Sequence, residues 1–220
     1  MNTAMKVFLF LGALVCTVES ICKEGELTAL EQTILDAHNA LRANHEGTED
    51  LCYAESGEDV TFISQAWADS MAEEKNMHHS SGEYGENLAY KGSSGDRVGQ
   101  EQAYILASKS WYSEIKDWNF AESKAKGGVT GHFTQLVWKE SKQMNCGYAE
   151  FENDYNSHYV VCQYFPRGNF GRTPEYVLNV GQIAEGADMS EYEIAEGSSA
   201  GGVFSSAVVM MVVAVFVAIH

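Results

Sequence analysis

The chain has 220 residues, of which 31 are Asp or Glu and 14 are Lys or Arg, so its formal net charge is −17. A surface of this charge repels the phosphates of nucleic acids and of anionic membranes, and both are therefore poor partners. Cations, basic proteins and neutral ligands are the partners that the composition favours.

Residues 1–20 have the features of a secretory signal peptide. Lys6 stands near the start, an apolar run covers Val7–Val15, and a Val-x-Ser ending suits cleavage after Ser20. Removal of this segment takes away Lys6 and Glu19, so the net charge stays at −17. The sequence therefore predicts an exported protein.

Three segments place apolar residues at helical spacing. The first, "TALEQTILDAHNALRANH" from Thr28, opens with a capping Thr followed three residues later by Glu31. The second covers residues 61–77 with Ile63 on its apolar face, and the third covers residues 101–115. We expect three helices, each with one face on the core.

Strands are predicted later in the chain, at residues 133–138, 144–152 and 158–166, where aromatic and β-branched residues gather. His132 would then stand at the mouth of the first strand. Residues 78–97 are rich in Gly and Ser and are expected to be irregular. The predicted helices come first in the chain and the predicted strands come later. This order indicates an α+β fold or a three-layer α-β-α sandwich around a central antiparallel sheet.

Four cysteines remain after the signal peptide, an even number in an oxidising compartment. The predicted strands 144–152 and 158–166 are joined by turn-rich residues, which would bring Cys146 to Cys162. Cys22 and Cys52 then pair by elimination. A zinc site built on cysteines is disfavoured because the sequence has no close Cys-x-x-Cys pair.

The C-terminal end carries a second apolar run within residues 199–220, preceded by small residues. This pattern favours a glycosylphosphatidylinositol (GPI) signal with attachment at Ser198 or a direct neighbour, and a short membrane span is the alternative. Residues 182–198 include five acids and no Lys or Arg, which predicts a solvated stalk. Residues 21–181 are left as one domain.

Two late motifs, "GHFTQLVWKES" and "YVVCQYFPRGNF", resemble the characteristic motifs of the CAP superfamily, which groups cysteine-rich secretory proteins, venom antigen five and plant pathogenesis-related proteins. "ILDAHNALRANH", "HSSGEYGENLAY" and "SWYSEI" resemble three further family motifs, in the family's order. The resemblance runs from about Leu30 to Phe170. The chain departs from many relatives in having four mature cysteines and no C-terminal cysteine-rich domain, so channel blocking is not expected.

The resemblance implies a three-layer α-β-α sandwich with a central cleft lined by two histidines and two acids. Carried over by motif, these residues are His79, Glu86, Glu114 and His132, and the family spacing favours His79 over its neighbour His78. Two neutral imidazoles beside carboxylates suit a divalent cation such as zinc. A metal-free cluster of His–Glu hydrogen bonds is the alternative, and both remain open.

The favoured function is a non-catalytic protein, secreted or anchored at the cell surface, that binds a lipid, a sterol or a protein ligand. A metal-assisted hydrolase with Glu86 or Glu114 as general base is a second hypothesis. It lacks the His-Glu-x-x-His and Gly-x-Ser-x-Gly motifs. A third hypothesis is an adhesion or signalling protein that acts through its acidic surface.

Overall fold

The computed structural model describes residues 22–23, 25–54, 62–153 and 155–192. The predicted signal peptide, the Ser198 attachment site and the apolar tail lie outside these residues. A four-stranded sheet has the order β1-β5-β6-β2, with bounds β1 Cys52–Tyr53, β5 Gln143–Glu152, β6 Asn156–Phe165 and β2 Gly85–Ser93. The three long strands are antiparallel, and the two-residue β1 joins β5 in parallel at one edge.

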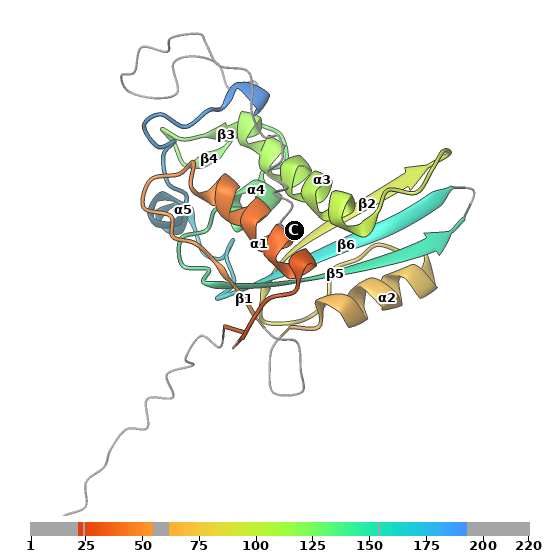
Figure 1. The fold of residues 1–220 in the computed structure, drawn as a ribbon. Coiled ribbons are helices and arrows are strands. Elements are labelled where there is room, and N and C mark those ends of the chain that lie inside the picture. The colour runs from red at the N-terminus through yellow and green to blue at the C-terminus, as the bar shows by residue number, and fades with distance from the viewer. Residues whose placement is uncertain (1–21, 24, 55–61, 154, 193–220) are drawn as a thin grey trace, which may run out of the picture.

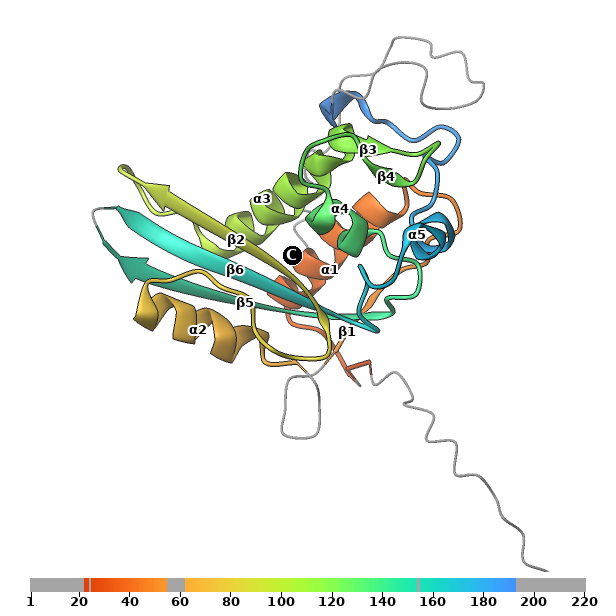
Figure 2. The ribbon, with the colours of Figure 1, turned by 180° about the vertical axis from the view of Figure 1, so that it is seen from behind.

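Helices cover both faces of this sheet (Figures 1 and 2). Helix α2 (Ser64–Glu74) packs on one face, against β5 and β6, and α1 (Ala29–Arg42), α3 (Gln100–Tyr112) and α4 (Gly131–Leu136) lie on the other. The α+β class and the three-layer α-β-α sandwich are therefore confirmed. The smaller elements are η1 (Ser113–Asp117), β3 (Trp118–Asn119), β4 (Lys124–Ala125), α5 (Thr173–Asn179) and η2 (Ser190–Tyr192).

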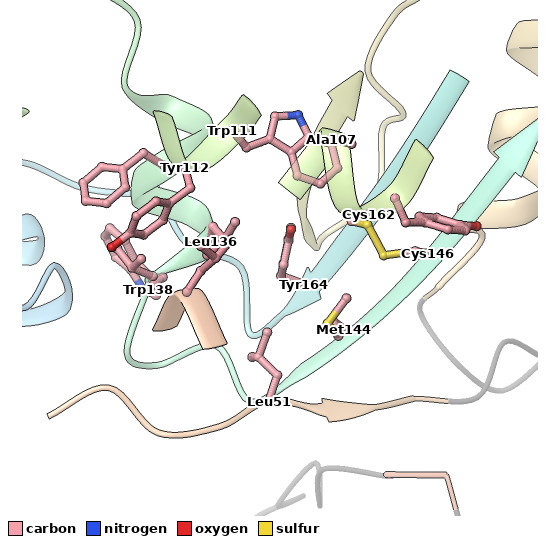
Figure 3. Packing of buried hydrophobic residues seen from close by; sticks show 14 of the residues in the cluster. Leu51, Ala107, Trp111, Tyr112, Leu136, Trp138, Met144, Cys146, Cys162 and Tyr164 are labelled. Atoms are coloured by element: carbon pink, nitrogen blue, oxygen red, sulfur yellow. A yellow bond between two sulfur atoms is a disulfide. The ribbon is translucent and has the colours of Figure 1, made fainter. Parts of the chain in front are cut away.

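The core of the described residues has three clusters, and the two larger ones lie on opposite faces of the sheet because successive residues of a strand point to opposite faces. In β6, Val160, Cys162 and Tyr164 join the large cluster beneath α1 and α3, whereas Tyr159 and Val161 join the cluster beneath α2. Figure 3 shows the larger cluster, with the disulfide between β5 and β6 at its side.

Both predicted disulfides are present. Cys146 and Cys162 lie directly opposite each other in the β5–β6 register, with Cα atoms 4.2 Å apart. Cys22 and Cys52 pair across a sequence separation of 30 residues.

The first predicted helix begins where its capping box places it. The Thr28 hydroxyl accepts a hydrogen bond from the Glu31 amide at 3.2 Å, and the Thr28 amide donates to the Glu31 carboxylate at 2.7 Å. The other two helices are shorter than predicted. Ile63, expected on a buried face, is the 42% exposed N-cap of α2.

Gly147 of β5 allows α2 to pack directly on the sheet. A Cβ atom at this position would lie 2.2 Å from the Ser64 carbonyl oxygen and 2.4 Å from the Gln65 nitrogen. Only glycine fits this contact between a strand and the start of a helix.

The predicted strand 133–138 is wrong, because Gly131–Leu136 forms helix α4. Every side chain from Phe133 to Trp138 is buried, so the segment has no polar face from which its period could be read. Thr134 donates to the Thr130 carbonyl at 3.0 Å, and Gln135 accepts from the Gly168 amide at 2.9 Å. These contacts stabilise a helical turn in a segment of high strand propensity.

Two other segments also differ from expectation. Residues 85–93, within the stretch predicted to be irregular, form the edge strand β2. Residues 182–192, predicted to belong to a solvated stalk, pack on the domain, and Ile183, Met189 and Tyr192 contact the large core cluster. The remaining stalk residues, 193–198, lie outside the described residues.

Candidate functional site

The first half of the site is built around Glu86, the second residue of β2. Its Oε1 accepts hydrogen bonds from His79 Nδ1 at 2.8 Å and from the Ser80 amide at 3.0 Å. Its Oε2 accepts from the Ser80 hydroxyl at 2.5 Å and from Gln163 Nε2 at 2.9 Å. This carboxylate therefore fixes the His79 ring and the loop that carries it.

The second half is built around Glu114 of η1. Its Oε1 accepts from His132 Nδ1 at 2.7 Å, and its Oε2 accepts from the backbone amides of His132 at 2.9 Å and Phe133 at 3.2 Å. Amides in the first turn of a helix have no hydrogen-bond partner within that helix, and a carboxylate satisfies them well. The Trp111 indole stacks on the His132 ring, with centroids 6.3 Å apart and planes at 22°.

Both histidines are held in the same way. A carboxylate oxygen only accepts hydrogen bonds, so each Nδ1 carries a proton, and in the neutral form of each imidazole Nε2 keeps a lone pair. The carboxylates are shielded, with 6% of the Glu86 and 17% of the Glu114 side chain exposed. His79 and His132 are 62% and 31% exposed, so solutes can reach the rings.

Asn87 links the two halves. Glu86 lies opposite Gln163 on the α2 side of the sheet, and the next residue, Asn87, points to the other side. There Asn87 Nδ2 donates to the His132 carbonyl at 3.0 Å and lies 3.5 Å from the Tyr164 hydroxyl. Asn87 thus stands in strand β2 and holds the start of α4.

His78 is turned away from this site. Its ring lies edge-on to Trp67 with centroids 4.9 Å apart, and its Nε2 is 3.8 Å from a Glu74 oxygen. The geometry thus places His79, as the family spacing favoured, beside Glu86.

Among the described residues, the compact group of three ligand atoms within 4.8 Å of one another consists of His38, Cys146 and Cys162. Both sulfurs belong to the disulfide and are not available to a metal. Among the residues that the structure places, neither the His79–Glu86 pair nor the His132–Glu114 pair belongs to a compact group of this kind.

A groove of about 500 Å³ lies beside the Glu86 half of the site. Ser80, which binds Glu86, lines this groove together with Ile63, Trp67, Tyr84 and Phe165. The other lining residues are Ser81, Gly82 and Glu83, so the groove combines apolar walls with polar groups.

Sequence reasoning missed Ser80, Gln163 and Trp111 as partners of the site. Gln163 is 77 residues from Glu86 in the chain, and only the strand pairing brings the two together. Ser80 was detectable in principle, because a hydroxyl next to a site histidine and six residues before a carboxylate can close a local hydrogen bond.

None of the helices in the described part of the chain has the length and apolar character needed to cross a bilayer. The solved structure of BmVAL-1 has a similar fold, with a TM-score of 0.51 and 22% identity over 68% of this chain and 82% of that one.

Two relatives are similar over the central part of the sequence. The secreted protein RBT4 of Candida albicans is 37% identical over 142 residues, 64% of this chain and 36% of RBT4, so the chain spans about a third of that relative. The human Golgi-associated plant pathogenesis-related protein 1 is 38% identical over 140 residues, 62% of this chain and 82% of the relative. The sequence model of the cysteine-rich secretory protein family, CAP, matches residues 35–164. The chain belongs to this family.

Proposed function

We propose that this chain is an extracellular, non-catalytic binding protein whose His/Glu cleft holds a divalent metal ion and whose adjoining groove receives a lipid or sterol. The observation that carries the proposal is the pair of matched contacts His79–Glu86 and His132–Glu114, at 2.8 and 2.7 Å. Each contact leaves one imidazole nitrogen free to bind.

The donor set fits zinc. Histidine ligands of zinc commonly donate their other ring N–H to a carboxylate, which sets the tautomer and raises the basicity of the ligand nitrogen. His79 and His132 would hold the ion through Nε2, with Glu86 and Glu114 as the orienting carboxylates. Bound zinc would supply a positive centre with coordination positions open to an oxygen ligand.

The hydrogen bonds argue against the hydrolase hypothesis. A general base needs a free lone pair within reach of the proton that it removes. Glu86 accepts four hydrogen bonds and Glu114 accepts three, all from the protein itself. Both carboxylates are thus engaged in holding the site, which supports binding over turnover.

The groove supports an apolar ligand. Trp67, Tyr84 and Phe165 give it aromatic walls next to the polar His79–Glu86 pair. Such a combination suits a molecule with an apolar body and one polar end, as in a sterol or a fatty acid. A protein ligand that inserts an apolar side chain is the alternative occupant.

An extracellular location is supported by the predicted signal peptide, by the two disulfides and by the secreted relative RBT4. We further propose that a GPI anchor at Ser198 holds the protein on the cell surface. The net charge of −17 supports the exclusion of nucleic acid as a partner.

The metal proposal is tested by calorimetric titration with zinc of the chain expressed through a eukaryotic secretory pathway. The double variant His79→Ala/His132→Ala should lose binding, and His78→Ala, a neighbouring exposed histidine outside the cleft, should retain it. Equal binding by the double variant and the wild type would sink the proposal, as would no binding by the wild type.

The ligand proposal is tested separately with radiolabelled cholesterol and palmitate. Ile63→Ser removes an apolar side chain from the groove and leaves a residue that is preferred at a helix N-cap, so α2 should keep its start. We expect weaker ligand binding by this variant with unchanged zinc binding. Retention of neither ligand by the wild type would exclude both ligand classes.

A further inference from the structure

The last described segment of the chain, residues 181–192, is anchored along the α1 side of the domain, and we refer to it as the C-terminal brace. Its start is held by three hydrogen bonds. His45 Nδ1 donates to the Gly181 carbonyl at 3.0 Å. The Glu46 amide donates to the Gln182 backbone carbonyl at 2.8 Å, and the Ala184 amide donates to the Asn44 backbone carbonyl at 2.8 Å. The brace therefore follows a fixed path from its first residue.

The end of the brace packs on Tyr112, the last residue of α3. The Tyr192 ring lies edge-on to Tyr112 with centroids 4.6 Å apart, and Met189 Sδ lies 3.8 Å from the Tyr112 hydroxyl oxygen. Tyr192 is 8% exposed and Tyr112 is fully buried. Figures 1 and 2 both show this segment, in blue, beside the end of α3.

Tyr112 stands next to both elements of the Glu114 half of the site. The 3-10 helix η1 begins at the following residue, so Glu114 lies two positions beyond Tyr112. Tyr112 also packs edge-on against Phe133, at 5.7 Å between centroids, and Phe133 follows His132 and donates its amide to Glu114. Tyr112 thus lies between the brace and the Glu114–His132 pair.

We propose that the C-terminal brace positions the Glu114–His132 pair, with Tyr192 and Met189 as positioning residues that act through Tyr112. Without the brace contact, Tyr112 keeps its hydrogen bond to His45 but loses its packing against Tyr192, and η1 and the first turn of α4 lose part of their common support. Among the described residues, the hydrogen bonds of His79 and Glu86 involve no residue of the brace, so that half of the site should be unaffected.

The test compares Tyr192→Ala with the matched control Phe151→Leu in the full chain. Phe151 is also 8% exposed, but it belongs to the cluster on the α2 side of the sheet. Amide hydrogen exchange is measured at His132 and Phe133, the two amides bound to Glu114. Tyr192→Ala should accelerate exchange at both amides, and the control should leave both unchanged.

The second readout, calorimetry with zinc alone, rests on the proposed function. Removal of a residue that orients a metal ligand typically costs 10–100-fold in affinity, and we expect about three- to tenfold for Tyr192→Ala because it acts one step further away. Phe151→Leu should bind zinc like the wild type.

The two readouts separate the two proposals. Unchanged exchange at His132 and Phe133 in Tyr192→Ala would overturn the positioning role, whatever the zinc result. No zinc binding by the wild type would overturn the metal proposal, and accelerated exchange would still support the brace. If Tyr192→Ala does not fold, Met189→Ala removes the sulfur from the Tyr112 hydroxyl, keeps the Tyr192 ring and decides the same question.

Discussion

Two buried histidines should make the stability of this protein fall as the pH is lowered. His38 and His45 are 0% and 2% exposed. His38 Nδ1 donates to the Ile34 carbonyl at 3.0 Å, and its Nε2 accepts from the Tyr164 hydroxyl at 3.0 Å. His45 is held in the same way, and both rings therefore fit their sites as neutral imidazoles.

Burial is the main reason why the pKa of each histidine is lowered from 6.5 to about 4, and the nearby Arg42 adds to this effect. The hydrogen bond to a backbone carbonyl acts in the opposite direction in both cases. Between these pH values the unfolded chain binds more protons than the folded chain, so the free energy of unfolding falls as the pH falls from about 6.5 to about 4. At about pH 5 the loss is about 2 kcal/mol for each histidine.

The assay is urea unfolding at about pH 7 and about pH 5, with the free energy of unfolding extrapolated to water. The wild type should lose about 4 kcal/mol between the two conditions, a large part of the 5–15 kcal/mol typical of a domain. His38→Gln and His45→Gln should each lose about half as much. Carboxyl groups with a lowered pKa, such as Glu31, titrate mainly below this window. An equal loss in the wild type and both variants would refute the assignment to these histidines.

Three substitutions test the packing that holds the site's framework, each by urea unfolding. Arg42→Met should lower the free energy of unfolding by about 3 kcal/mol or more, because the buried guanidinium donates to four backbone carbonyls that would lose a partner. A decrease of less than about 1 kcal/mol would contradict this. Gly147→Ala should cost about 1–3 kcal/mol because the added methyl meets the Ser64 backbone, and an unchanged midpoint would show that α2 shifts freely. Thr28→Ala should cost about 1 kcal/mol through loss of the cap to Glu31, and Thr28→Ser, which keeps the hydroxyl, should cost less.

The sequence predicted the start of α1 because the signal is local. Thr28 and Glu31 are three residues apart and bind each other's backbone, so the cap needs no partner from elsewhere in the chain. The Cys146–Cys162 pair was predictable for a related reason, since a short turn joins the two strands that carry it. Contacts of this kind, between residues or strands that are close in the chain, can be predicted from the sequence alone.

The errors arose where distant contacts decide the conformation. Helix α4 has a strand-like sequence, and its turn is fixed by Gly168 and Asn169, more than 30 residues further along the chain. Residues 182–192 were predicted to be solvated because of their acidic residues. The apolar residues Ile183, Met189 and Tyr192 lie among these acids, and they pack on the core. Charge pattern alone predicted a stalk, but a few apolar contacts are enough to dock a segment.

The site residues were predicted from family resemblance and not from spacing. Glu114 and His132 are 18 residues apart, and no periodicity relates them. Their pairing depends on the position of η1, which follows α3, and on the residue at which α4 begins. Tertiary contacts determine both positions. Resemblance supplied the positions, whereas the reason for the pairing, a carboxylate that caps the first turn of α4, became visible only in the structure.

The site depends on the register of one edge strand. Glu86 and Asn87 are consecutive residues of β2, so they point to opposite faces of the sheet, and each holds one half of the site. A slip of β2 by one residue against β6 would exchange the two faces and separate both halves from their partners. Asn87 lies opposite Cys162, and Cys162 is bonded to Cys146 on the neighbouring strand. The disulfide therefore holds β5 and β6 in the register against which β2 pairs, so this cross-link also bears on the contacts that Glu86 and Asn87 make.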